Sequence, residues 1–108
     1  MPRPRKCRLI AENPVEKFYK PQGIKMRDLN QIILHHDQLE ALRLADADRL
    51  DQIKAAAKMN ISRSTFSRLV NEARYIVATA LVNGWALKIE GGNFEVQTEK
   101  ISKINMKG

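Results

Sequence analysis

Apolar residues recur every three to four positions between residues 66 and 81, which is the spacing of one face of an α-helix. The pattern predicts a helix over residues 63–82. Ser62 in front of it is a favoured N-cap residue, and Asn83 with Gly84 behind it is a typical stop signal. The predicted buried stripe of this helix consists of Phe66, Leu69, Val70, Ala73, Val77, Ala80 and Leu81.

Two shorter helices are predicted before this one. Asp37 followed by Glu40 has the spacing of a capping box, in which two side chains satisfy the free amides at a helix start. This pair predicts a first helix over residues 37–47, and Asp51 is the predicted N-cap of a second helix over residues 52–59. The expected packing faces are Leu39, Leu42 and Ala45 in the first helix and Ile53, Ala56 and Ala57 in the second.

Three residues between the second and third predicted helices suit a tight turn. Asn60 tolerates a left-handed backbone, Ile61 can enter the core, and Ser62 caps the next helix. With small Ala56 at the helix crossing and Phe66 inside, the segment meets the demands of a helix-turn-helix unit, whose helices cross at about 90–120°. The alternative structure is an ordinary helical hairpin in a small bundle.

Short β elements are predicted on both sides of the helices. Residues 7–11 and 18–20 have the composition of strands, whereas residues 31–36 are ambiguous between an extended segment and a helix end. After the third helix, two further strand patterns flank the Gly91-Gly92 pair, which is typical of a two-residue β-hairpin loop. In this hairpin we expect Ile89 to face Phe94, Leu87 to face Val96, and Lys88 to face Glu95.

The predicted fold class is therefore mainly α with small β elements: a tri-helical helix-turn-helix core, short N-terminal strands and a C-terminal β-hairpin. A length of 108 residues suits one domain, and 44% hydrophobic residues suffice for a core. We assign residues 7–98 to this domain and residues 99–108 to a loose tail. Residues 1–6 are expected to form a flexible basic arm, because prolines alternate there with cations.

The sequence also bears on the cellular compartment. Cys7 is the single cysteine, which excludes an intrachain disulfide and favours a reducing, cytoplasmic location. No apolar run approaches the length of about 20 residues that spans a bilayer. The basic start is not followed by the apolar segment of a signal peptide. We therefore expect a cytoplasmic protein without a membrane span.

The formal net charge of +7 is unevenly distributed, with +6 in residues 1–27, −3 in residues 28–50 and +3 in residues 51–84. Two separate cationic stretches suit a polyanionic partner. In the arm, Arg3 and Arg5 fit the narrow minor groove of A·T-rich DNA. Contact with phosphates at no particular sequence is the favoured interpretation of these two residues.

If DNA is the polyanion, the exposed side of the third predicted helix is expected to enter the major groove. Arg can donate two hydrogen bonds to guanine, Asn can pair with adenine, and Ser is a short donor or acceptor. The candidate base-reading residues are Arg63, Ser64, Ser67, Arg68 and Asn71, and the candidate phosphate contacts are Arg3, Arg5, Lys6, Lys54, Lys58, Ser62, Thr65 and Arg74.

Three segments in this order resemble a known family: LEALRLAD at 39–46, SRSTFSRL at 62–69 and ALKIEGGN at 86–93. With the opening Pro-Arg-Pro-Arg-Lys-Cys, they are similar to an uncharacterised family of small predicted DNA-binding proteins of bacteria and archaea. The similarity extends over residues 2–94. The helical middle is also similar, more distantly, to the promoter-reading helix-turn-helix region of sigma factors. The resemblance implies a helix-turn-helix protein that binds double-stranded DNA, and no target genes are implied.

The chain departs from this family pattern in two places. Relatives usually have Leu-Ser-Gln-Glu-Glu where residues 50–54 read Leu-Asp-Gln-Ile-Lys, so the capping box is lost although Asp51 can still cap. The usual glycine of the turn is replaced by Asn60. Both changes affect helix stability more than DNA contacts.

The sequence disfavours both metal binding and catalysis. Cys7, His35, His36 and Asp37 offer ligand chemistry, but adjacent histidines point in different directions and a structural zinc site needs four ligands. The chain has no phosphate loop, nucleophile elbow or carboxylate pair, so we expect a protein that is not an enzyme and holds no cofactor.

The alternative function is a protein-interaction adaptor built on the same helical core. Its expected mark is an exposed apolar patch, for which Trp85, Ile101, Ile104 and Met106 are candidates. Structured RNA ranks last as a partner, because 6% aromatic residues leave few stacking platforms. A homodimer would suit the reading of paired half-sites, but the sequence leaves oligomeric state and effector ligand open.

Overall fold

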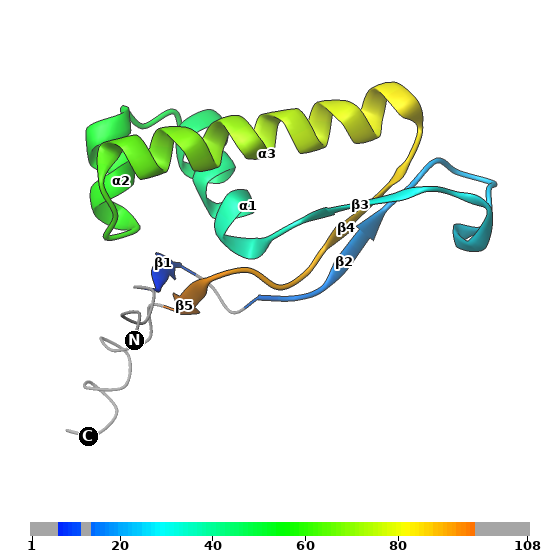
Figure 1. Cartoon of the computed structure of the whole chain (residues 1–108), viewed down its shortest axis with the longest axis horizontal. Coiled ribbons are helices and arrows are strands. Elements are labelled where there is room, and N and C mark those ends of the chain that lie inside the picture. The colour runs from blue at the N-terminus through cyan, green and yellow to red at the C-terminus, as the bar shows by residue number, and fades with distance from the viewer. Residues whose placement is uncertain (1–6, 12–13, 97–108) are drawn as a thin grey trace, which may run out of the picture.

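The computed structural model describes residues 7–11 and 14–96. This part of the chain is mainly α with small β elements, as predicted (Figure 1). The helices are α1 (His36–Leu42), which continues into the π-helical turn η2 (Arg43–Ala47), α2 (Gln52–Lys58) and α3 (Arg63–Asn83). The strands are β1 (Arg8–Ile10), β2 (Lys17–Tyr19), β3 (Gln31–Leu34), β4 (Ala86–Ile89) and β5 (Phe94–Val96), and the 3-10 turn η1 (Met26–Asp28) precedes β3.

The N-terminal half of α3 packs into a core with the other helices. Phe66 of α3 is completely buried, and Met59 fills the space at the end of α2. The small side chains of Ala55 and Ala56 let α2 approach α3 closely, which confirms the predicted role of Ala56. The buried cluster consists of Ala41, Leu44, Ala55, Ala56, Met59, Phe66, Leu69 and Val70.

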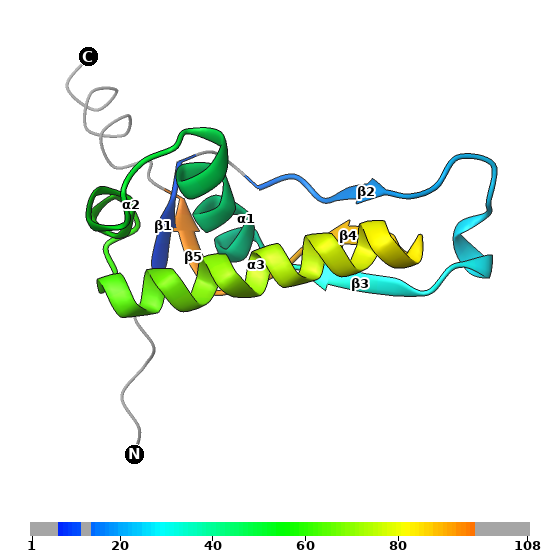
Figure 2. The ribbon, with the colours of Figure 1, turned by 90° about the horizontal axis from the view of Figure 1, so that it is seen from above.

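The C-terminal half of α3 covers a small sheet. Leu34 of β3 and Ile89 of β4 are buried against Ala73 of α3. Seen from above, α3 lies over β3 and β4, whereas β2 extends past its side (Figure 2). The inner face of α3 therefore belongs to two cores: its N-terminal half packs among the helices, and its C-terminal half packs on the sheet.

The strands pair with other partners than the predicted ones. β4 is the central strand of three and pairs with β2 in antiparallel and with β3 in parallel orientation. β5 pairs in parallel with β1 in a separate sheet of two strands. The predicted register between the two C-terminal strands is wrong, because Ile89 lies opposite Lys17 and Leu34, and Phe94 lies opposite Arg8.

The turn between β4 and β5 packs on the start of α1, which explains this pairing. The backbone N–H of His36 donates to the Gly91 carbonyl at 2.9 Å, and Nδ1 of His35 donates to the Glu90 carbonyl at 2.9 Å. Gly92 has φ +113°, and a Cβ there would lie 2.6 Å from Oδ1 of Asp37. The chain is held against α1 at this turn, so β4 and β5 each pair with another strand.

The first helix begins earlier than predicted, and Asp37 is not its N-cap. His35 occupies that position, and its backbone N–H donates to Oε1 of Gln38 at 2.9 Å. Asp37 lies in the first turn and is buried, with Oδ2 accepting from Nη1 of Arg8 at 3.2 Å. The Asp37 carboxylate therefore binds Arg8, 29 residues away in the sequence, and does not cap the helix as predicted.

Three residues predicted to be buried are exposed. Ile53 and Ala57 lie on the outer side of α2, which turns its Ala55 side inward instead. Leu81 is 77% exposed, because the first two helices do not reach the last turns of α3. The spacing of apolar residues predicted the helices correctly, but it did not predict how much of each helix surface the rest of the protein covers.

Other predictions on the local structure are confirmed. Asp51 caps α2 by accepting from the N–H of Lys54, and Gly84 ends α3 with φ +68°. The ambiguous segment 31–36 resolves into β3 followed by the start of α1. The predicted arm and tail lie outside the described residues. None of the described helices is long and apolar enough to cross a membrane.

A matched pair of substitutions on α3 tests this distribution of burial. Phe66→Ala should lower the free energy of unfolding by about 3–5 kcal/mol, because it empties the centre of the helical core. In the monomer at low protein concentration, Leu81→Ala should change it by less than about 0.5 kcal/mol, because its side chain is exposed there. Urea denaturation measures both. Equal losses would contradict the described position of the last turns of α3.

Candidate nucleic-acid interface

The turn between α2 and α3 has the predicted geometry. Asn60 adopts a left-handed backbone with φ +58°, and its N–H donates to the Ala57 carbonyl at 3.1 Å. The N–H of Ile61 donates to the Ala56 carbonyl at 3.1 Å, and the Ile61 side chain packs against the helical core. Ser62 then starts α3, with Oγ accepting from the N–H of Thr65 at 3.1 Å. A tight turn therefore fixes how α3 leaves α2.

The first turns of α3 carry a polar outer face. Arg63, Ser64, Arg68 and Asn71 are exposed, and Ser67 is half-buried. All five candidate base-reading residues thus lie on the first turns of α3, outside the side that buries Phe66. The described part of the chain therefore offers them together to a partner.

Arg68 is held by an ion pair on the same helix. Its Nη1 donates to Oε2 of Glu72 at 3.2 Å, one turn further along. The other carboxylate oxygen of Glu72 accepts from Nε2 of Gln38 in α1 at 3.1 Å. Both partners of the ion pair are well exposed, so water screens the attraction and Arg68 can exchange Glu72 for another acceptor.

Arg74, a candidate phosphate contact, is occupied by a carboxylate. Its Nε and Nη2 donate to the two oxygens of Asp46 at 2.9 Å and 2.7 Å. These hydrogen bonds lower the pKa of Asp46 and raise the pKa of Arg74. The forked contact ties α3 to η2, and it neutralises the charge that the sequence assigned to a phosphate.

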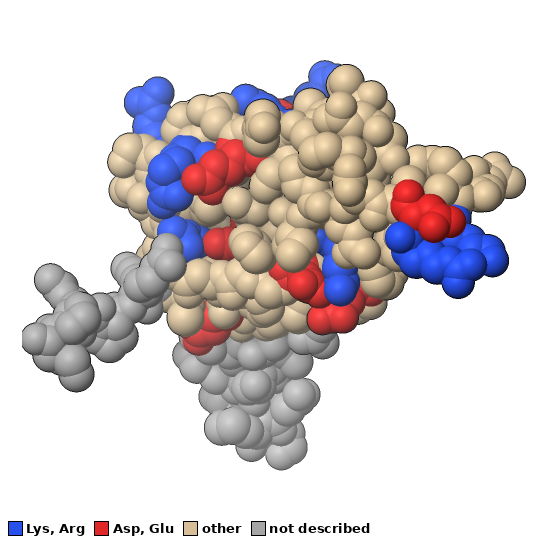
Figure 3. Space-filling view, turned by 45° about the vertical axis from the view of Figure 1, so that its right-hand side comes forward, with Lys and Arg blue, Asp and Glu red and all other residues tan. Residues whose placement is uncertain are grey.

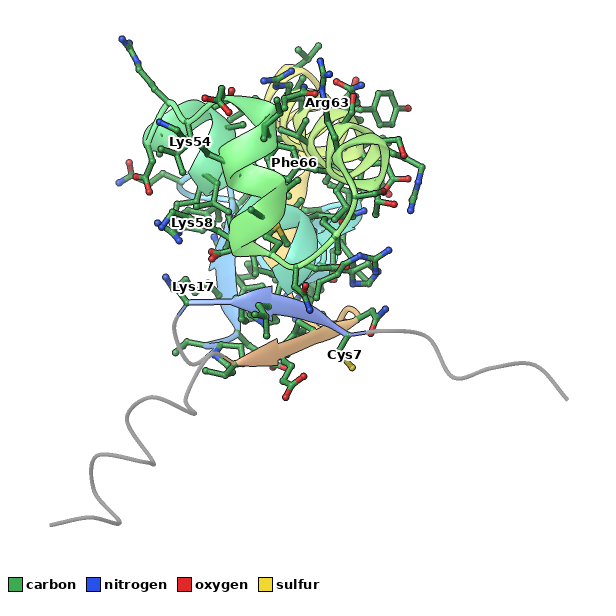
Figure 4. All side chains as sticks on the ribbon, turned by 90° about the vertical axis from the view of Figure 1, so that its left-hand side faces the viewer. Cys7, Lys17, Lys54, Lys58, Arg63 and Phe66 are labelled. Atoms are coloured by element: carbon green, nitrogen blue, oxygen red, sulfur yellow. The ribbon has the colours of Figure 1, made fainter. Side chains whose placement is uncertain are left out.

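The other candidate phosphate contacts fall into three groups. Lys54 and Lys58 are exposed on α2 and extend away from the body (Figure 4). Ser62 and Thr65 bond to each other at the start of α3, with 2.9 Å between their hydroxyl oxygens. Arg3, Arg5 and Lys6 lie outside the described residues.

The two neighbouring histidines, His35 and His36, have different surroundings. His35 is exposed and bonded to the β4–β5 turn, whereas His36 is buried edge-on to Phe94, with ring centres 5.3 Å apart. Burial lowers the pKa of His36. Within residues 7–11 and 14–96, no three His, Cys, Asp or Glu side chains come together as metal ligands do.

Sequence reasoning missed Arg8. It assigned the residue to a strand but gave it no role, whereas the structure buries it beside Asp37 with 7% of its surface exposed. The sequence contained a signal, because residues two apart in a strand point to the same face. Arg8 therefore shares the face of the apolar Ile10, which favours burial. The basic run in front of Arg8 obscured it.

The fold and this site define a small three-helix protein with an exposed polar face at the start of its longest helix. The family model described as a protein of unknown function, DUF134, matches residues 1–97, and the chain belongs to this family. No solved structure matches the chain.

Relatives of the chain carry the family name UPF0251. A UPF0251 protein of Rhodospirillum rubrum is 58% identical over 92 residues, which is 85% of this chain and 64% of that protein. One from Dehalococcoides mccartyi is 54% identical over 96 residues, covering 89% and 82%. One from a Thermoanaerobacter species is 47% identical over 100 residues, covering 93% and 88%. The match thus spans less than two thirds of the Rhodospirillum protein.

Substitutions of Asn60 test the turn. Asn60→Gly should keep the free energy of unfolding within about 0.5 kcal/mol of the wild type, because glycine adopts the left-handed backbone without strain. Asn60→Val should lower it by about 1–2 kcal/mol, because its branched Cβ clashes in this conformation. Thermal and urea unfolding of both variants check this. A stable Asn60→Val protein would contradict the left-handed turn.

Proposed function

We propose that this chain binds double-stranded DNA in a sequence-specific manner and regulates transcription in the cytoplasm. In this proposal the first turns of α3 enter the major groove. The observation that carries it is the outer face of these turns: five polar residues, including two arginines, presented by a helix whose opposite side is sealed in the core. The role is one of binding, and no reaction is assigned to the chain.

The surroundings of α3 support this orientation. Lys54 and Lys58 on α2 are exposed cations, and in this proposal they contact DNA phosphates outside the groove. Arg68 would exchange its exposed partner Glu72 for guanine, which accepts two hydrogen bonds from one guanidinium. Arg74 contributes to phosphate binding only if it leaves Asp46.

Arginine and lysine substitutions should affect binding in different ways. Arg63→Ala and Arg68→Ala should each reduce the discrimination between a selected site and a scrambled duplex by about 1–3 kcal/mol. Lys58→Ala should weaken binding to both duplexes alike and lower the salt slope by about 1. Selection of bound duplexes from random DNA, followed by titrations at two salt concentrations, supplies both measurements.

Arg27→Ala is the matched control, because Arg27 is an exposed cation in η1, at the far end of the molecule from the start of α3. It should change neither discrimination nor salt slope. Equal losses on both duplexes for Arg63→Ala, Arg68→Ala and Lys58→Ala would contradict base reading by α3.

An exposed apolar surface at the C-terminal end of α3 supports a second proposal, a contact with a protein partner. Val82 is 83% exposed, and Tyr75 and Leu81 are also largely exposed. Figure 3 shows largely uncharged surface in this region. Of the residues predicted for an apolar patch, Trp85 is half-buried beside it, and Ile101, Ile104 and Met106 lie outside the described residues.

We propose that this apolar surface contacts a second copy of the chain. Residues 75–87 contain no charged side chain in a protein of net charge +7, so two copies repel least where these segments meet. Leu81 and Trp85 also line a groove of about 230 Å³ beside β2, in which Lys20 is the single charged residue. A ridge and a groove on one patch can pack against the same patch of a partner related by twofold symmetry.

Charge placed on this patch should separate the copies. Leu81→Asp should convert a dimer into a monomer in sedimentation experiments, because it buries an unpaired carboxylate in the contact. Val15→Asp is the control, because Val15 is also an exposed apolar residue but lies outside the patch. A wild-type chain that remains monomeric both free and on DNA would refute the proposed contact, and the adaptor function would then need another partner.

A further inference from the structure

A cleft of about 560 Å³ lies where β1, the turn before α3 and the residue after the β4–β5 turn meet. Its polar lining comes from Arg8, Asn60, Ser62, Thr65 and Asn93, and two apolar residues complete it. We call it the turn cleft. It joins segments from both ends and the middle of the described chain, so the fold and not one local motif creates it.

The chemistry of the turn cleft favours an anion. No aspartate or glutamate lines it, while its walls carry a guanidinium group, two amides and two hydroxyls. The start of α3, at Ser62, adds the positive end of a helix of 21 residues. Phosphate oxygens accept hydrogen bonds from all of these donors.

Arg8 supplies the observation that points to a ligand. Its residue surface is 7% exposed, and Nη1 donates to Asp37 at 3.2 Å. Its Nε–H, however, is the single buried side-chain polar atom of the described residues that has no hydrogen-bond partner. A buried donor without a partner is costly, and an oxygen atom entering the cleft beside Arg8 would relieve that cost.

The neighbouring clefts suit an anion less well. One of about 500 Å³ shares Arg8 with the turn cleft and is also lined by Arg68, but it contains the carboxylates of Asp37 and Glu72. Another, of about 660 Å³, is lined by the cations Lys17 and Arg43 and by the carboxylates of Glu40 and Asp46. Carboxylates repel an approaching phosphate, so the turn cleft is the favoured site among the three.

We infer that the turn cleft binds a phosphate group. The group belongs either to the DNA backbone or to a free phosphorylated small molecule, since both present the same oxygens to the same donors. Binding of the DNA backbone rests on the proposed function, whereas binding of a free phosphorylated molecule does not. In either case the site lies at the start of the helix that is proposed to read DNA, so occupancy would stabilise the position of α3.

The first experiment needs no DNA. Inorganic phosphate is titrated into the full-length chain against chloride at constant ionic strength, and amide and arginine side-chain NMR signals are recorded. The amides of residues 60–65 and the Nε–H of Arg8 should shift and saturate, whereas those of residues 26–28 at the far end should not. Shifts that are uniform or fail to saturate would overturn the inference.

Three variants assign the effect to this cleft. Thr65→Val removes a hydroxyl with little change of shape and leaves the backbone N–H that Ser62 accepts. Asn60→Gly removes an amide at a position where glycine fits the backbone. Each should weaken phosphate binding by about fivefold, as expected for one lost hydrogen bond. Arg8→Lys keeps the charge beside Asp37 but lacks Nε–H, so it should weaken binding while the protein stays folded.

Thr79→Val is the control, because it is the same substitution on the same helix at a residue that does not line the cleft. Its phosphate affinity should equal that of the wild type. If Thr79→Val weakens binding as much as Thr65→Val does, the loss does not come from the cleft and the inference fails.

A second experiment identifies the source of the phosphate. A DNA backbone contact predicts that Thr65→Val weakens binding to a selected site and to a scrambled duplex by the same factor of about five, as one lost phosphate hydrogen bond does. Unchanged DNA affinity together with saturable phosphate binding assigns the cleft to a free ligand. A wild-type chain that does not bind DNA would refute the proposed function, and the phosphate titration would still test the cleft.

Discussion

The structure depends on a single long helix whose inner face has to satisfy two different cores. Phe66 and Val70 of α3 pack among the other helices, and Ala73 and its neighbours pack on the sheet formed by β2, β3 and β4. Neither core is large, so each relies on the rigidity of the shared helix to align it with the other. Burial along this one side leaves the opposite side of α3 facing outward for most of its length.

This outward side is divided by chemistry. The first turns carry arginine, serine and asparagine, and the last turns carry tyrosine, leucine and valine without any charge. The boundary lies near Arg74, which is bound to Asp46. The proposed DNA site at one end and the proposed contact between copies at the other would therefore lie on one helix.

The Arg8–Asp37 ion pair links the remaining parts to this helix. It joins β1 to the start of α1 and lies beside the turn cleft. Removal of either partner would leave a buried charge, so the pair acts mainly to specify how β1 is placed. The backbone supports the same placement, because the N–H of Leu9 donates to the Met59 carbonyl at the end of α2. A strand from the N-terminus is thus fixed beneath the turn that leads into α3.

The sequence by itself determined the features that depend on neighbouring residues. Asp51, Asn60, Ser62 and Gly84 were each read correctly, because a cap or a left-handed turn is decided within about four residues. The exposed polar face at the start of α3 followed from helical spacing in the same way. What only the tertiary structure decided are contacts between distant segments: the partners of β4 and β5, the inward turn of Asp37, the exposure of Leu81 and the burial of Arg8. Each depends on which surfaces meet in space, and the order of residues along the chain does not encode that in any local pattern.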